Sequence, residues 1–116
     1  MKYEVVPTYT FERDLKRLSK KHRSLKDDVA VFKRELLENP TMGDDMGDNT
    51  RKIRIAISSK NQGKRGGARV ITYNLLINVE NARIYLLSIY DKSEQKNISD
   101  VEIRQLKKIN GLLTEI

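Results

Sequence analysis

The segment Arg51–Tyr73 reads RKIRIAISSKNQGKRGGARVITY, and it decides which fold we expect. Isoleucines occupy every second position in Ile53–Ile57, which predicts a strand with one buried face. Val70–Tyr73 is rich in β-forming residues. Between them lies Ser58–Gly67, a polar segment with three glycines, as is typical of a loop. The stretch therefore predicts two strands joined by a glycine-containing loop.

The same segment carries a dense positive charge. Its 23 residues include seven cations and not one carboxylate. A solvated surface usually mixes charges of both signs, whereas an uncompensated set of Lys and Arg attracts phosphate groups. We interpret the predicted hairpin as a nucleic-acid contact surface; its cations are Arg51, Lys52, Arg54, Lys60, Lys64, Arg65 and Arg69.

Composition limits the classes of protein to consider. The 116 residues predict a single domain over residues 1–116. A net charge of +7 and a pI near 9.7 favour polyanions, or an acidic protein, as partners. Because the chain has no cysteine, disulfides and thiolate chemistry are excluded. We find neither a signal peptide nor an apolar run of about 18 residues, so we expect a cytoplasmic protein.

We predict neither a metal nor a cofactor. The one histidine, His22, has no metal-ligand residues near it, and we expect it at the surface without a role. The three aspartates of Met42–Asn49 lack the spacing of a calcium loop, so that segment is predicted to be a solvated loop. The glycine pattern matches neither a P-loop nor a dinucleotide fingerprint, and we interpret it as a flexible hairpin tip.

Upstream of the hairpin, the pattern predicts a strand and two helices. Tyr3–Val6 is the strand. Thr8 or Thr10 can cap the first helix, and Ser24 starts the second, which ends at Asn39-Pro40. The connection between the helices is short, so we expect an antiparallel helical pair packed on a sheet. Their apolar positions are Phe11, Leu15 and Leu18, then Leu25, Val29, Phe32 and Leu36.

Downstream, the second hairpin strand is expected to run to Ile77 and turn at residues 78–81. Arg83–Tyr90 returns as a central strand covered on both faces. Ser99–Glu102 is a capping box that opens a last helix, with an apolar stripe through Ile103, Leu106, Ile109, Leu112 and Leu113. The fold class is therefore α+β in the order β-α-α-β-β-β-α, with an antiparallel meander, an N-terminal helical hairpin and a C-terminal helix.

These features resemble the RelE/ParE superfamily of bacterial toxins, and most closely its RelE-like, HigB-type members. The resemblance is carried by RKIR at 51–54, GKRGGAR at 63–69, Tyr73, and YLLSIYDKSE at 85–94. Asn39-Pro40 followed by Gly43 also fits an N-P-x-x-G junction of that family. The resemblance covers nearly the whole chain and implies the RelE-like microbial RNase-type fold.

Such proteins are toxins of type II toxin–antitoxin pairs. The resemblance implies a ribosome-dependent endoribonuclease that cuts mRNA in the ribosomal A site and inhibits translation. The implied partners are the ribosome, mRNA and a cognate antitoxin, with a monomeric toxin inside the toxin–antitoxin complex. The implied reaction needs no metal, because the RNA 2′-OH attacks the adjacent phosphate.

This chemistry suits the residue types that are present. Arginine grips phosphate in a bidentate manner, and a lysine crowded by cations has a lowered pKa and can exchange protons. The resemblance places five residues near the cleaved phosphate, with Tyr90 as a further candidate: Arg54, Lys64, Arg65, Arg69 and Lys92. Of these we expect Arg54 and Arg69 to hold the phosphate, Lys64 or Lys92 to exchange protons, and Tyr90 to stack or donate. The predicted RNA-binding residues are Arg51, Lys52, Lys60 and Arg65, with Lys52 and Lys60 in electrostatic steering and Arg51 able to pair with Asp48 instead.

Two alternatives stay open. A ParE-like toxin shares the fold but inhibits DNA gyrase by binding, and a non-catalytic RNA-binding module would use the basic hairpin for grip alone. The RelE branch also uses a tyrosine at the start of the last helix. This chain has Ile98-Ser99-Asp100 there, so a mechanism that depends on that tyrosine does not transfer.

Overall fold

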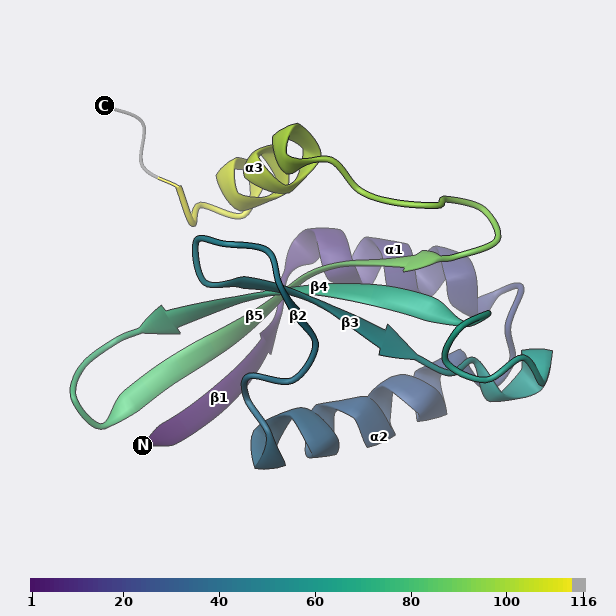
Figure 1. Cartoon of the computed structure of the whole chain (residues 1–116), viewed down its shortest axis with the longest axis horizontal. Helices are drawn as coiled ribbons and strands as arrows, with labels where there is room; N and C mark the ends of the chain where they lie inside the picture. The colour runs from purple at the N-terminus through teal and green to yellow at the C-terminus, as the bar shows by residue number, and fades with distance from the viewer. Residues whose placement is uncertain (114–116) are drawn as a thin grey trace.

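The computed structural model describes residues 1–113 as three helices and a five-stranded sheet (Figure 1). The described elements are β1 (Lys2–Pro7), α1 (Tyr9–Ser19), α2 (Leu25–Glu38), β2 (Asp44–Asp45), β3 (Thr50–Ile55), the 3-10 helix η1 (Ser58–Lys60), β4 (Ala68–Leu76), β5 (Asn81–Asp91) and α3 (Asp100–Ile109). The α+β class and the order of the main elements are confirmed.

The sheet is mixed rather than wholly antiparallel. Its strand order is β1-β5-β4-β3-β2, and β1 runs parallel to β5 while every other pair is antiparallel. The predicted meander of β3, β4 and β5 is confirmed, and β5 is an interior strand between β1 and β4. The prediction of a plain loop at Met42–Asn49 is wrong in part, because Asp44 and Asp45 pair with Lys52 and Arg51 as a short edge strand.

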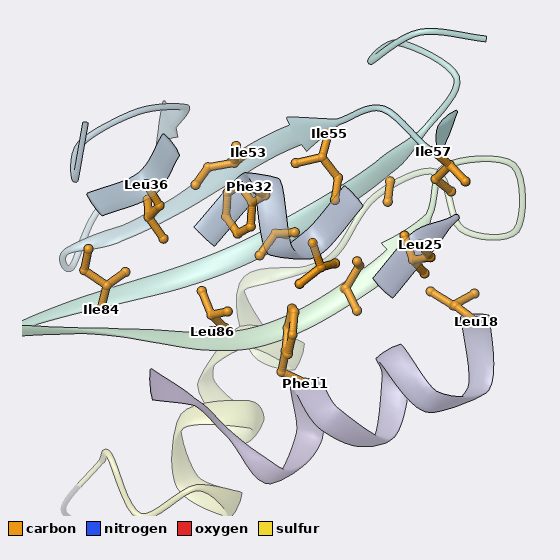
Figure 2. Packing of buried hydrophobic residues seen from close by; sticks show 14 residues of the cluster. Phe11, Leu18, Leu25, Phe32, Leu36, Ile53, Ile55, Ile57, Ile84 and Leu86 are labelled. Carbon is orange, nitrogen blue, oxygen red and sulfur yellow. The ribbon is translucent and has the colours of Figure 1, made fainter. Parts of the chain in front are cut away.

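Two apolar clusters hold the layers together. The larger lies between the sheet and the α1–α2 pair, where Phe11, Phe32 and Leu36 are almost fully buried against alternate residues of β3, β4 and β5 (Figure 2). The smaller lies on the other face, where Ile98 and Ile103 cover β4 and β5. The alternation of β3 therefore buries its isoleucines towards α1 and α2 and turns its even-numbered residues towards the α3 side.

The helix ends follow their predicted caps, with one correction. Thr8, not Thr10, caps α1 by accepting the Phe11 amide, and Ser99 forms the expected capping box with Glu102. Ser24 precedes α2, but its hydroxyl donates to Asp28 instead of capping the helix.

Helix α3 is shorter than its apolar pattern predicted. It ends at Ile109, which is 62% exposed, and Leu112 and Leu113 lie beyond it. The chain reverses at Gly111, whose φ of +70° favours glycine. None of the helices within residues 1–113 is long and apolar enough to cross a bilayer.

Candidate functional site

Three predicted site residues form a row across adjacent strands. Arg54 of β3 pairs with Arg69 of β4, and Arg69 pairs in turn with Tyr90 of β5. Direct neighbours in antiparallel strands lie about 5 Å apart, so the three side chains stand together. Tyr90 packs against Ile98 and Ile103, which places the row on the face that α3 partly covers. This row is the centre of the candidate site.

The two arginines of the row have different surroundings. Arg54 is exposed and makes no hydrogen bond or ion pair with any residue within 1–113. Arg69 is only 4% exposed. Burial and the neighbouring charge of Arg54 both lower the pKa of Arg69. Like charges on directly opposite residues are unfavourable, and a bound anion would relieve their repulsion.

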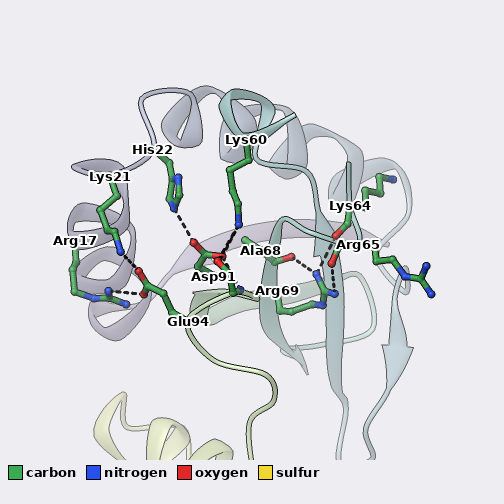
Figure 3. A network of polar contacts seen from close by, with 11 residues as sticks. Arg17, Lys21, His22, Lys60, Lys64, Arg65, Ala68, Arg69, Asp91 and Glu94 are labelled. Atoms are coloured by element: carbon green, nitrogen blue, oxygen red, sulfur yellow. Dashed lines mark hydrogen bonds and ion pairs between the residues drawn. The ribbon is translucent and has the colours of Figure 1, made fainter. Parts of the chain in front are cut away.

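The guanidinium of Arg69 organises the loop that precedes it (Figure 3). Its Nη1 donates to the carbonyl oxygens of Lys64 at 3.0 Å and Ala68 at 3.2 Å, and its Nη2 donates to that of Arg65 at 3.0 Å. The predicted role of this side chain is to hold the cleaved phosphate. The guanidinium binds the carbonyls of the loop itself, so part of its hydrogen-bonding capacity is already used.

The sequence predicted a flexible tip, and the structure shows this loop packed closely against β3. Gly67 packs so closely on β3 that an added Cβ would lie 2.1 Å from the carbonyl oxygen of Ile55. Gly63 adopts a φ of +64°, which turns the chain between η1 and β4. The side chains of Lys64 and Arg65 are exposed and make no bond within the described chain. The loop thus presents two exposed cations that have no bonding partner among residues 1–113.

Tyr90 and Lys92 follow at the end of β5. Tyr90 is 4% exposed, and its hydroxyl is buried without a hydrogen-bond partner among residues 1–113. Burial raises the pKa of this hydroxyl. The backbone of Lys92 donates to the Gly67 carbonyl at 3.0 Å, which joins it to the end of the loop. Its Nζ donates to the Lys96 carbonyl at 2.8 Å.

The other predicted cations separate into different environments. Lys52 lies on the same face of β3 as Arg54, and its Nζ donates to Asn97 at 3.2 Å. Arg51 lies on the opposite face; it donates to the Gly43 carbonyl at 3.2 Å and lies 4.0 Å from Asp45, not beside Asp48. The structure therefore does not bring Arg51 into the row.

Lys60 is not a free surface cation. Its Nζ donates to Asp91 at 2.9 Å and to Ser93 at 3.1 Å. The other oxygen of Asp91 lies 2.9 Å from Nε2 of His22. We predicted His22 at the surface without a role, but its side chain is only 13% exposed and forms part of this network. No sequence signal could have found the contact, because 69 residues separate the partners.

No group of three or more His, Asp and Glu side chains in the described part of the chain is arranged to hold a metal ion. The site combines the Arg54–Arg69–Tyr90 row with the exposed side chains of Lys64 and Arg65 on the loop. The hydroxyl of Tyr90 is buried within it. Such a surface can bind a phosphate chain and stabilise added charge on phosphorus.

Comparison with known families identifies the family of the chain. The family model described as "RelE toxin of RelE / RelB toxin-antitoxin system" matches residues 8–116, which is nearly the whole chain. This chain therefore belongs to the RelE toxin family, and it is the toxin of a toxin–antitoxin system with an antitoxin as its partner.

Proposed function

We propose that this toxin is a ribosome-dependent endoribonuclease that cuts mRNA and so inhibits translation. The observation that carries the proposal is the Arg54–Arg69 pair, in which an exposed arginine with no ion-pair partner in the described part of the chain lies beside a second arginine that is buried. A pair of like charges is costly to maintain for the fold alone. An RNA phosphate over the row would relieve that cost.

The proposed reaction uses the 2′-OH of the RNA as nucleophile on the adjacent phosphate. The oxygen–phosphorus bond to the 2′ oxygen forms, the bond to the 5′ oxygen breaks, and a proton moves from the first oxygen to the second through protein groups. Arg54 binds the phosphate oxygens and matches the extra negative charge of the transition state. Arg69 adds its positive charge to that of Arg54, and its hydrogen bonds hold the loop that carries Lys64 and Arg65.

Lys64 and Lys92 are the proposed proton-exchanging groups. Lys64 is exposed at the loop, and Lys92 adjoins the loop through the Gly67 carbonyl. Arg65 and Lys52 bind the flanking phosphates. Tyr90 contacts the substrate only if Ile98 and Ile103 move off its ring, because its hydroxyl is covered. The RKIR and GKRGGAR motifs support placing the toxin in the HigB-type branch.

The test is mRNA cleavage in a translating extract, followed by mapping of the cut ends. We expect cleavage by the wild type and about a hundredfold less by Arg54→Ala, as for the loss of one preorganised charge partner. Arg34→Ala is the matched control, since Arg34 is an exposed arginine on α2 without a bond in the described chain. Equal cleavage by Arg54→Ala and the wild type would contradict the proposed site.

The rival functions predict other results. A ParE-like toxin would leave mRNA intact and inhibit gyrase supercoiling in purified form. A non-catalytic RNA-binding module would bind RNA without producing cut ends. The density of free cations around one row favours the nuclease over both.

A further inference from the structure

A buried carboxylate at the end of β5 joins three segments that are distant in sequence (Figure 3). Asp91 is 2% exposed, and it faces the side of the sheet opposite to Tyr90. Its Oδ1 accepts hydrogen bonds from Lys60 Nζ at 2.9 Å, from the Ser93 hydroxyl at 2.7 Å and from the Ser93 amide at 3.0 Å. Its Oδ2 hydrogen-bonds His22 at 2.9 Å.

The charge of this carboxylate is strongly stabilised. Burial alone would raise the pKa of Asp91, but the hydrogen bonds from Lys60, Ser93 and His22 outweigh burial and hold the pKa well below its usual value. Lys60 forms an ion pair with it, and both side chains are largely withdrawn from water. A buried pair of this kind is costly to break, because either partner alone would be an uncompensated charge.

Asp91 binds Lys60, which is the last residue before the basic loop of residues 61–67. The first two residues of η1 are held by α2, since the Ser58 amide donates to Asp28 at 2.9 Å and the Ser59 amide donates to the Ser24 hydroxyl at 2.9 Å. The third residue, Lys60, is held by Asp91. Residues 61–67 are therefore held at their start by the Lys60–Asp91 pair. Further along, the Arg69 guanidinium holds them by hydrogen bonds to the carbonyls of Lys64 and Arg65.

We propose that Asp91 is a positioning residue of the site: through Lys60 it fixes the start of the basic loop, and thereby the placement of Lys64 and Arg65. Asp91 does not touch the row itself, because it faces the α1–α2 turn. Its catalytic consequence rests on the proposed RNA-cleaving function. The position of the loop can be measured without that function.

The first measurement is limited trypsin digestion of the folded protein, which cuts after Lys64 and Arg65 when the loop is released. We expect Asp91→Asn to be cut there about tenfold faster than the wild type, because Lys60 would lose its counter-charge. The double variant Asp91→Asn/Lys60→Gln removes both charges and leaves a neutral hydrogen-bonding pair. It should return the digestion rate to within about threefold of the wild type.

The matched control is Glu94→Gln. Glu94 is a nearby carboxylate that pairs with Arg17 and Lys21 of the α1 region and does not contact the loop. Its loss removes the same charge from the same end of the molecule, so digestion at the loop should match the wild type. If Asp91→Asn does not fold, Lys60→Gln takes its place in the assay, because this variant breaks the same contact by changing the other partner.

The second measurement is single-turnover mRNA cleavage on saturated ribosomes, with binding followed separately. A positioning role predicts a cleavage rate about tenfold lower for Asp91→Asn at nearly unchanged ribosome affinity. Wild-type digestion of the loop in Asp91→Asn and Lys60→Gln would overturn the inference. So would faster digestion with an unchanged rate of cleavage once bound. If the wild type cuts no mRNA, the proposed function fails, and the digestion result still decides whether Asp91 positions the loop.

Discussion

Replacing Arg69 by alanine tests whether this arginine is a clamp of the loop. The substitution removes three hydrogen bonds from a charged donor to the carbonyls of Lys64, Arg65 and Ala68. Hydrogen bonds with a charged partner contribute about 1.5–3 kcal/mol each, but water can replace those at the exposed Lys64 and Arg65. We therefore expect the free energy of unfolding to fall by about 3 kcal/mol rather than by the full sum.

The assay is thermal unfolding followed by circular dichroism. For a domain of this size, a loss of about 3 kcal/mol lowers the Tm by roughly 12 °C. Arg69→Lys should recover only part of this loss, because one ammonium cannot replace a planar fork that reaches three carbonyls. Arg54→Ala is the comparison, since it removes an unpaired exposed arginine and relieves the repulsion on Arg69. Its Tm should equal or slightly exceed that of the wild type.

Comparing cleavage and stability in the two variants separates the proposed roles of Arg54 and Arg69. Arg54→Ala should lower cleavage by about a hundredfold while it preserves the fold, and Arg69→Ala should weaken both. A Tm for Arg69→Ala within about 2 °C of the wild type would show that the three carbonyl contacts contribute little, and the clamp interpretation would be wrong.

Further expectations follow from the loop, the network and the charge. Gly67→Ala should lower the free energy of unfolding by about 3 kcal/mol in urea titrations, because its Cβ would overlap the Ile55 carbonyl, whereas Gly63→Ala meets no atom and should cost about 1 kcal/mol. Because the folded-state pKa of Asp91 lies below its unfolded value, its contribution to stability is present above about pH 4 and is lost as the pH falls further. Denaturant midpoints should therefore fall more between pH 5 and pH 3, as rough bounds of that window, in the wild type than in Asp91→Asn; parallel curves would contradict this. Binding to single-stranded RNA should weaken with salt by a slope of roughly 0.7 per neutralised phosphate, and Arg54→Ala should reduce that slope by about one such unit.

Local sequence patterns were enough to predict most helices and strands, and the side of β3 on which Arg54 lies. The alternation in Ile53–Ile57 places Arg54 opposite the buried isoleucines, and the capping box at Ser99 marks the start of α3. Both signals depend on neighbours within a few residues, so no tertiary information is needed.

Contacts between distant segments could not be predicted in this way. Nothing near Lys60 or His22 in the sequence indicates that both bind Asp91, because the folded sheet brings them together. The burial of Arg69 had a weak local signal, since Ala68 and Val70 on either side of it belong to a buried strand. A cation in such a strand needs internal acceptors, and the loop carbonyls supply them.

The parallel pairing of β1 with β5 has a consequence for synthesis of the toxin in the cell. Val5 pairs with Ile84, so the first strand of the sheet has no partner until a strand near the other end of the chain has left the ribosome. Pairing at such sequence separation makes folding slower than local hairpin formation. A nascent chain that already contains the whole basic hairpin therefore still lacks a complete sheet behind it. The row of Arg54, Arg69 and Tyr90 therefore forms only after nearly the whole chain has been made, because Tyr90 belongs to β5.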